Sequence, residues 1–286
     1  MTLHFIRIIA IAVLVATCML LPYIPGDYDS LAVTLSTMAQ LLGIAGMLLV
    51  PIGTLWLIYE SMKRLKKDWK FPNKNKTHGF AIAALVASGL IAIVTSLGAF
   101  ANNNLSLCII TLVVCVYIVS KFAARLKQMK KAENRNFNPT PFYLIFIPIV
   151  VVFIRFMFIT PAIELSRNYA IRQSEKLIQD IEAYHAKNGH YPSSLLSLWK
   201  DYKPSVIGIK QFHYEPYRNA YNLCFEQFSN QLGIREIVMY NKLNEQDISS
   251  HDSDLLVLSP EDIILQRGHI AAYDLPNPHW KYFCFD

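Results

Sequence analysis

The sequence predicts a membrane all-α protein with five transmembrane helices, followed by a small α+β extracytoplasmic domain with a long N-terminal helix and an antiparallel sheet. Two observations support this fold class. First, 53% of the 286 residues are hydrophobic and only 17% are charged, whereas a soluble domain carries about 25% charged residues. Second, long uncharged stretches fill positions 1–160, whereas positions 161–286 have the composition of a soluble domain.

Five stretches of the first half are long enough to cross a bilayer. A helix needs about 20 apolar residues for this, because a backbone amide without a hydrogen bond costs several kcal/mol in lipid. The requirement is met by residues 5–24, 38–59, 80–101, 105–122 and 142–160.

Glycine and other small residues predict how two of these helices pack. The second stretch should be kinked beside a helix contact, because it contains Gly43, Gly46, Pro51 and Gly53. The third stretch carries a small residue at every fourth position, which predicts close packing against another helix: Ala84, Ser88, Ala92 and Ser96.

The charges between the stretches predict the orientation of the chain, because Lys and Arg near helix ends stay in the cytoplasm. Seven lie between positions 63 and 76 and six between positions 121 and 135, whereas residues 26–37 carry only Asp27 and Asp29. We therefore expect a bacterial cytoplasmic membrane protein with a cytoplasmic N-terminus and an extracytoplasmic chain after Thr160. The net charge of +6 comes from these loops, so the predicted partner is the lipid bilayer and not nucleic acid.

The first stretch has an alternative interpretation as a signal peptide. Arg7 precedes its apolar part, and residues 15–18 (VATC) loosely resemble a lipoprotein cleavage box. However, Thr17 is a poor residue before such a cut, and the apolar run continues to Leu21. We interpret the stretch as an uncleaved helix, and cleavage would leave the later topology unchanged.

Arg155 is the ionisable residue that stands out inside the apolar stretches. The first four have none in their middle, whereas Arg155 lies in the fifth, five residues before Thr160. Charges in lipid are costly and often functional. The sequence predicts that Arg155 reaches the headgroups as an anchor; the alternative is a functional charge acting with Glu164.

A long amphipathic helix is predicted over residues 161–186, because apolar side chains, among them Ile171 and Ile178, recur along one face. Pro161 should bend or restart this helix, and Asn188-Gly189 should end it with a left-handed cap.

Residues 184–198 read Tyr-x-x-x-Asn-Gly-x-Tyr-Pro-x-x-Leu-x-x-Leu. This segment resembles the helix-to-sheet junction of type II secretion pseudopilins and related pilin-like proteins, over about residues 164–225. The resemblance implies a long helix that precedes an antiparallel sheet, and it transfers no catalytic site. It does not extend to the prepilin cleavage motif, which residues 138–141 (NPTP) lack. The alternative interpretation is a generic helix cap followed by a turn.

Short apolar and aromatic runs predict an antiparallel sheet over residues 211–214, Ala220–Gln227, Arg235–Asn241 and Trp280–Phe285. Cys224 and Cys284 lie in two of these strands and are the only cysteines after position 160. Two thiols in an oxidising compartment usually pair. We therefore predict a disulfide between Cys224 and Cys284, which would close a loop of about 60 residues.

The sequence predicts no cofactor and no metal site. His185 and His190 flank a turn without a third ligand, so surface histidines are predicted rather than zinc ligands. The motifs of metalloproteases, serine hydrolases, phosphate loops, dithiol redox centres and dinucleotide binding are absent. A solvated acidic surface, without calcium-loop spacing, is predicted in residues 244–268 from Asp247, Asp252, Asp254, Glu261, Asp262 and His251.

These observations favour a structural or interaction protein over an enzyme. A membrane domain, residues 1–160, would hold the outer domain, residues 161–286, for contact with a protein partner at the outer face. The oligomeric state is left open. The alternative is a membrane enzyme or small-solute transporter with a site at the outer helix ends, near Asp27, Asp29, Arg155 and Glu164.

Overall fold

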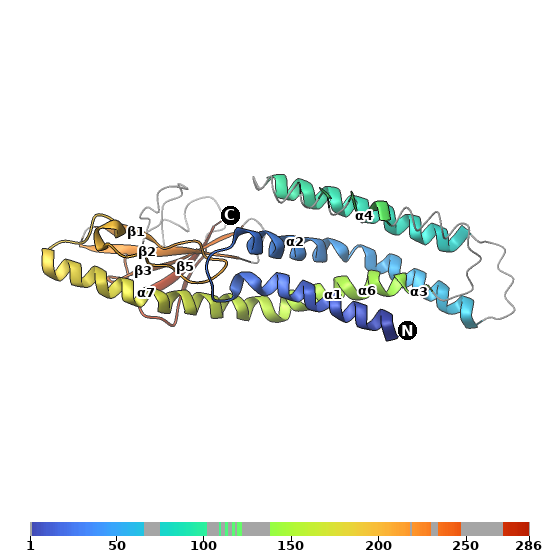
Figure 1. Ribbon diagram of the computed structural model, residues 1–286, viewed down its shortest axis with the longest axis horizontal. Coiled ribbons are helices and arrows are strands. Elements are labelled where there is room, and N and C mark those ends of the chain that lie inside the picture. The colour runs from blue at the N-terminus through green and yellow to red at the C-terminus, as the bar shows by residue number, and fades with distance from the viewer. Residues whose placement is uncertain are drawn as a thin grey trace. The chain divides into compact units, whose positions relative to one another are not determined.

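The computed structural model (Figure 1) describes residues 2–65, 75–101, 138–217, 219–229, 234–246 and 271–285, with residues 109, 112, 113, 116, 117 and 119–121. The chain divides into two compact units. The first comprises Met1–Met19 and Thr34–Met157, and the second comprises Leu20–Val33 and Phe158–Asp286. The C-terminal unit therefore includes a loop that lies within residues 1–160 of the sequence-based division.

Apolar helices make up the first unit. They are α1 (Thr2–Leu20), α2 (Ser30–Gly46), α3 (Leu49–Leu65), α4 (Asn75–Ala101) and α6 (Thr140–Ile154). Their exposed side chains include many large apolar ones, such as Phe5, Leu90 and Phe153. Such surfaces are usual for helices whose solvent is lipid.

Among the described residues, three helical stretches are long and apolar enough to cross a membrane: Leu3–Tyr23, His78–Leu97 and Thr140–Asn188. The pair α2 and α3 makes a fourth if the two helices form one bent span. Several membrane-spanning helices are thus compatible with the fold. Five are not confirmed, because the predicted stretch 105–122 lies largely outside the described residues.

The second predicted stretch is bent, as its glycines and proline indicate. α2 and α3 meet at an angle of 53°, and their glycines lie against α6. A Cβ at Gly43 would lie 2.0 Å from Cγ1 of Val151, and a Cβ at Gly53 would lie 2.9 Å from Cγ1 of Ile145. The missing side chains let the helix backbones approach closely, so both the bend and the contact are confirmed.

α4 contacts α3, and its four predicted small residues are all at least partly buried. Ala84 and Ser96 are buried, whereas Leu90, on another face of the helix, is 58% exposed. Trp56 of α3 is fully buried and stacks on Phe80 of α4, with 6.3 Å between the ring centroids. The burial of Ala84 and Ser96 is compatible with the predicted packing role, and the close approach of another helix at these small residues stays a prediction.

A π-helical turn, η2 (Arg155–Ile159), joins α6 to α7 (Thr160–Asn188). Pro161 accounts for this wider turn, because a proline lacks the amide hydrogen and its ring clashes with the carbonyl four residues earlier. α7 ends as predicted: Gly189 has a φ of 74° and donates its amide to the carbonyl of His185 at 2.9 Å.

The C-terminal unit contains a five-stranded antiparallel sheet in the order β1-β2-β3-β5-β4. Three strands have the predicted bounds, whereas β1 begins two residues later than predicted and β4 was not predicted. Pro216 lies in β1, an edge strand, where a missing amide hydrogen is tolerated. The strands are β1 (His213–Tyr217), β2 (Ala220–Gln227), β3 (Arg235–Asn241), β4 (Ala271–Asp274) and β5 (Trp280–Phe285).

One face of the sheet packs against the apolar face of α7. Leu177 and Ile181 of α7 are fully buried in the same cluster as Leu223 and Phe225 of β2 and Val238 of β3. Burying each such side chain contributes roughly 1.5–3 kcal/mol, so this contact is the main core of the domain. The predicted combination of a long helix and an antiparallel sheet is observed.

The predicted disulfide is wrong, because Cys224 and Cys284 are both free thiols. Cys224 pairs with Met239 of β3, and Met239 pairs with Lys281 of β5, three residues before Cys284. Side chains alternate between the faces of a sheet along each strand. The two cysteines therefore point to opposite faces, and β3 separates their strands, whereas a disulfide needs Cα atoms within about 7 Å.

Candidate functional site

The loop between α1 and α2 is bound to the C-terminal domain through its backbone. Four backbone hydrogen bonds of 2.7–3.1 Å join residues 22–29 to residues 205–208. The two backbone segments approach each other closely, since a Cβ at Gly208 would lie only 2.6 Å from the carbonyl oxygen of Pro22. We call this paired segment the loop ribbon. It makes the loop between α1 and α2 an integral part of the C-terminal unit.

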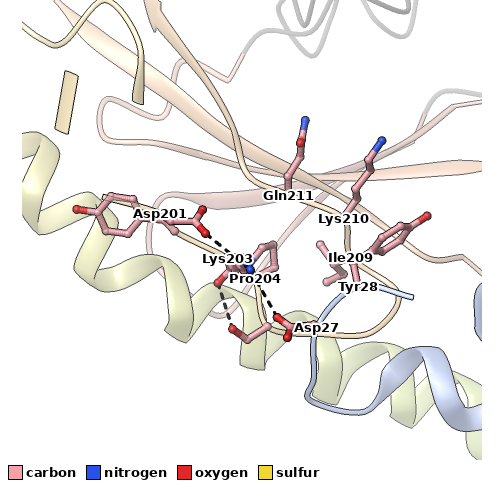
Figure 2. Close-up of a pocket in the computed structure, with 10 residues that line it drawn as sticks. Asp27, Tyr28, Asp201, Lys203, Pro204, Ile209, Lys210 and Gln211 are labelled. Atoms are coloured by element: carbon pink, nitrogen blue, oxygen red, sulfur yellow. Dashed lines mark hydrogen bonds and ion pairs between the residues drawn. The ribbon is translucent and has the colours of Figure 1, made fainter. Parts of the chain in front are cut away.

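A hollow of about 320 Å³ lies beside the loop ribbon (Figure 2). Both segments of the ribbon contribute to its walls, together with the chain that leads into β1. The hollow is lined by Asp27, Tyr28, Asp201, Tyr202, Lys203, Pro204, Ser205, Ile209, Lys210 and Gln211.

Lys203 lies between two carboxylates in the hollow. Its Nζ is 3.8 Å from Oδ1 of Asp27 in the loop and 3.7 Å from Oδ2 of Asp201 (Figure 2). All three side chains are largely exposed, so each ion pair contributes no more than about 1 kcal/mol to stability. These charges are therefore available to an incoming group.

Lys210 and Gln211 leave further polar groups free in the hollow. Both side chains are exposed and point the same way, away from the α7 ribbon (Figure 2). Lys210 makes no ion pair with a described residue, and the ring of Tyr28 nearby is 42% exposed. An ammonium, an amide and a phenol are thus presented together, which suits a polar or acidic partner group.

The chain on one side of the hollow is fixed to α7 by Asp180. Its carboxylate accepts hydrogen bonds from Lys200 Nζ at 2.7 Å and from the hydroxyl of Tyr202. The hydrogen bonds from Lys200 and Tyr202 lower the pKa of Asp180 below its ordinary value, and burial opposes them. Burial, with Asp180 beside it, raises the pKa of Tyr202.

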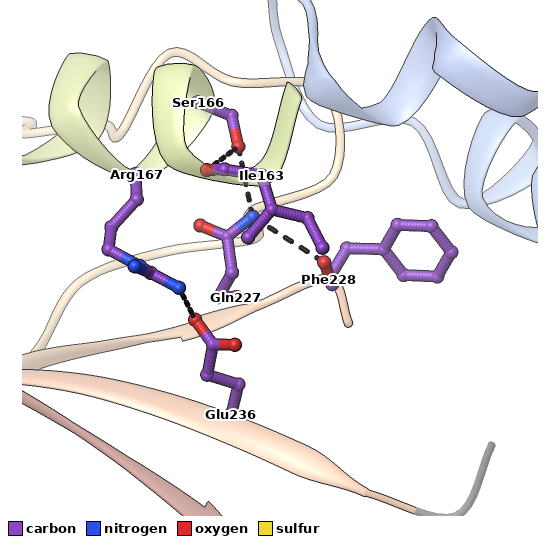
Figure 3. Close-up of polar contacts among 6 residues, drawn as sticks. All are labelled: Ile163, Ser166, Arg167, Gln227, Phe228 and Glu236. Carbon is purple, nitrogen blue, oxygen red and sulfur yellow. Dashed lines mark hydrogen bonds and ion pairs between the residues drawn. The ribbon is translucent and has the colours of Figure 1, made fainter. Parts of the chain in front are cut away.

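A second polar cluster fixes the start of α7 to the sheet (Figure 3). Arg167 of α7 pairs with Glu236 of β3, and Nε2 of Gln227 donates to Oγ of Ser166 at 3.0 Å. The Arg167 guanidinium also lies 4.2 Å from the ring centroid of Tyr282. Burial raises the pKa of Glu236, and the charge of Arg167 opposes that rise. These groups are enclosed, so they act in packing rather than in binding.

The predicted functional charge Arg155 contacts another apolar helix. Its Nη1 donates a hydrogen bond to Oε1 of Gln40 in α2. Gln40 Nε2 in turn donates to Oγ of Ser36 at 3.2 Å, and Ser36 Oγ donates to the carbonyl of Met19 in α1 at 2.7 Å. Glu164, the residue proposed to act with Arg155, is exposed on α7.

The acidic residues predicted near the outer helix ends have separate contacts. Asp27 lines the hollow, whereas Oδ1 of Asp29 accepts the amide of Leu31 at 2.8 Å at the start of α2. Asp29 therefore caps a helix, which is a structural role.

Sequence reasoning missed Lys203, Lys210, Gln40 and the ion pair of Arg167 with Glu236. For Gln40 a signal existed, because Ser36 and Gln40 are polar residues four apart on one face of an apolar helix. For the others the sequence gives no signal, because a charged residue that joins a site or an ion pair has the same local sequence pattern as any other exposed or amphipathic charge. Only the fold shows which of these charges lie together.

The candidate metal residues are not assembled into a site. His185 stacks on Tyr191, and His190 lies against the edge of Tyr184. Among the described residues, no group of three or more His, Cys, Asp or Glu is placed to hold a metal ion. The predicted acidic surface lies largely outside the described residues. Comparisons with protein-family models, with curated proteins and with solved structures each give no match to this chain.

Proposed function

We propose that this chain is a bacterial cytoplasmic membrane protein that holds an extracytoplasmic domain for contact with a protein partner. The partner binds at the hollow that Asp27, Lys203 and Lys210 line. The observation that supports this proposal is the loop ribbon, in which residues 22–29 are hydrogen-bonded to residues 205–208.

The loop ribbon matters because residues 20–33 connect the end of α1 to the start of α2. The domain is therefore tied to the membrane helices at the loop as well as through α7. A domain held in this way loses less freedom when it binds a partner, which strengthens binding without any added contact. A purely flexible tether would need only one connection.

The hollow has the composition of a protein-binding surface. Tyr28 offers a large ring with a polar end, a residue type that is enriched where partners bind most tightly. Lys203, Lys210 and the carboxylates beside them supply a charged rim, which favours a partner with its own acidic and basic groups. The resemblance of residues 164–225 to pilin-like domains, whose helix leads into a sheet, supports an interaction role.

Photo-crosslinking in cells tests the proposal. A photoreactive phenylalanine analogue replaces Tyr28 in the hollow or, as the control, Tyr117, whose side chain is 61% exposed in the membrane half. We expect a discrete protein adduct at position 28 and none at position 117. The adduct should weaken in Lys210→Glu and persist in Lys187→Glu, a matched charge reversal on the exposed end of α7.

Two results would refute the proposal. One is the absence of any adduct at position 28 while the protein is present in the membrane at its normal level. The other is a reporter fused after Asp286 that is active only in the cytosol, because the domain would then face the wrong compartment.

A further inference from the structure

Trp199 is the most exposed large apolar side chain among the described residues, with 93% of its surface exposed. It follows η3 (Leu195–Leu198), a 3-10 turn, in which residues three apart lie on the same face. Leu195 and Leu198 pack against the core of the domain, whereas Leu196, three positions before Trp199, is 84% exposed. Leu196 and Trp199 thus form an outward-facing pair, which we call the apolar knob.

The backbone of Trp199 is strained. Its φ of 54° and ψ of 28° are left-handed, a conformation that bulky residues rarely adopt because Cβ then crowds the following carbonyl oxygen. Its amide donates to the carbonyl of Leu196 at 3.1 Å, which closes the turn. Strain of this kind is concentrated at functional sites. A tryptophan that is both strained and exposed therefore indicates a binding role for the indole.

The hollow beside the loop ribbon begins next to the apolar knob. Asp201, which lines the hollow, is two residues from Trp199, so their Cα atoms are at most about 7 Å apart. The indole does not fill the hollow of its own chain, because it is almost fully exposed. With a volume of about 320 Å³, the hollow has room for an indole. The ring of Tyr28 and the ammonium of Lys203 in its walls (Figure 2) both attract aromatic rings.

The charges of the hollow are self-complementary. Two carboxylates, Asp27 and Asp201, and two ammonium groups, Lys203 and Lys210, line it. A partner that carries only one sign of charge would be repelled by half of these groups, whereas a second copy of the chain brings the same mixture. In a two-fold contact both copies present the same surface, so the knob of each meets the hollow of the other and a cation can face an anion.

We propose that two copies of this chain bind each other through a two-fold contact in which Trp199 of each copy occupies the hollow of the other. Leu196 joins Trp199 in this contact. The inference rests on the proposed function, because it names a second copy as the partner at the same hollow. Buried indoles near the centre of a contact are the anchors that dominate the binding energy of many protein interfaces.

Co-purification of two differently tagged forms of the full chain in mild detergent tests the contact. Purification through one tag should recover the second tag with the wild type. Trp199→Gly in both forms should lower this recovery about tenfold. The variant should remain as abundant and at least as heat-stable as the wild type, because glycine adopts the left-handed backbone without strain. Gln211→Trp in both forms should lower the recovery equally, because it fills the hollow.

A mixed pair separates the proposed contact from general stickiness. A copy with Trp199→Gly keeps its hollow, and a copy with Gln211→Trp keeps its indole at position 199. Together they can form one of the two contacts, so recovery in the mixed pair should exceed that of either variant alone. Leu243→Ala is the matched control, because it removes another exposed apolar side chain of the same unit and should leave recovery unchanged.

Several results would overturn the inference: an unchanged recovery in Trp199→Gly, no gain in the mixed pair, or a loss in Leu243→Ala as large as that in Trp199→Gly. A photoreactive residue at position 199 that captures lipid instead of a second copy would do the same. The adduct at position 28 separates this failure from that of the proposed function. An adduct with a different protein overturns only the second copy as partner, whereas the absence of any adduct overturns both.

Discussion

Arg167 of α7 and Glu236 of β3 form an ion pair whose side chains are only 8% and 9% exposed. The guanidinium is also stacked on Tyr282, so one arginine connects the helix to two strands. Taking both charges out of water is expensive, and their mutual attraction roughly compensates. The pair therefore fixes the position of α7 on the sheet more than it adds stability.

Removing one partner of this pair should be costly. Arg167→Met leaves the Glu236 carboxylate buried without a counter-charge, and we expect it to lower the free energy of unfolding by about 3–5 kcal/mol. The double variant Arg167→Met, Glu236→Leu should recover most of this loss. Hydrogen exchange of the β3 amides in the full chain measures the free energy of unfolding of the single and the double variant. Equal losses in the single and the double variant would contradict the compensation argument.

The contact of Asp180 with Lys200 and Tyr202 predicts a pH dependence. Because the folded-state pKa of Asp180 is lowered from 3.8, its contribution to stability is present above that value and is lost as the pH falls through the folded pKa. Asp180→Asn should therefore be less stable than the wild type at neutral pH, by up to about 1 kcal/mol. Melting temperatures of the two proteins should converge below about pH 3.8. A constant difference across the range would contradict the prediction.

The close approach of α2 and α6 predicts a rescue experiment. Gly43→Ala would place a methyl group against Val151, whose branched side chain has little freedom to move, and should cost about 1–3 kcal/mol. Val151→Ala in the same protein should restore the stability. The fraction of protein that stays monodisperse after heating in detergent measures the stability of the single and the double variant. Gly89→Ala is the matched control, because a Cβ there meets nothing within 4 Å.

The free thiols predict a labelling pattern. Cys224 is buried and Cys284 is half-buried, and burial raises the pKa of both thiols. Mass analysis of the unreduced protein should find both alkylated after unfolding. In the native state alkylation should occur slowly at Cys284 and not at Cys224. A cystine-linked peptide that joins these residues would contradict the strand register.

Local patterns predicted much of the fold. The bounds of β2, β3 and β5, the end of α7 at Asn188 and the bend between α2 and α3 all follow from periodicity, glycine and proline. β4 could not be found in this way, because a four-residue edge strand has too few positions for an alternating pattern. The prediction of the disulfide was wrong for a different reason. The face of a sheet on which a cysteine lies depends on the register between strands, which local patterns do not give.

The candidate site was predicted less well than the fold. The sequence singled out Arg155 and Asp27 as unusual charges, but it could not give their partners. Gln40 is 115 positions from Arg155 and Lys203 is 176 positions from Asp27, and only the folded chain makes them neighbours. Glu164 had no such partner among the described residues, and its exposure gives it no evident role.

Pro216 restricts how the C-terminal sheet can grow. It lies in β1 at one edge of the sheet, where any strand added by a second polypeptide would require a regular series of amide donors. The proline interrupts that series of donors and so disfavours pairing of another strand with this edge of the sheet. Self-assembly by strand addition, with the fibres and aggregates to which it leads, is thus hindered on the β1 side of the sheet.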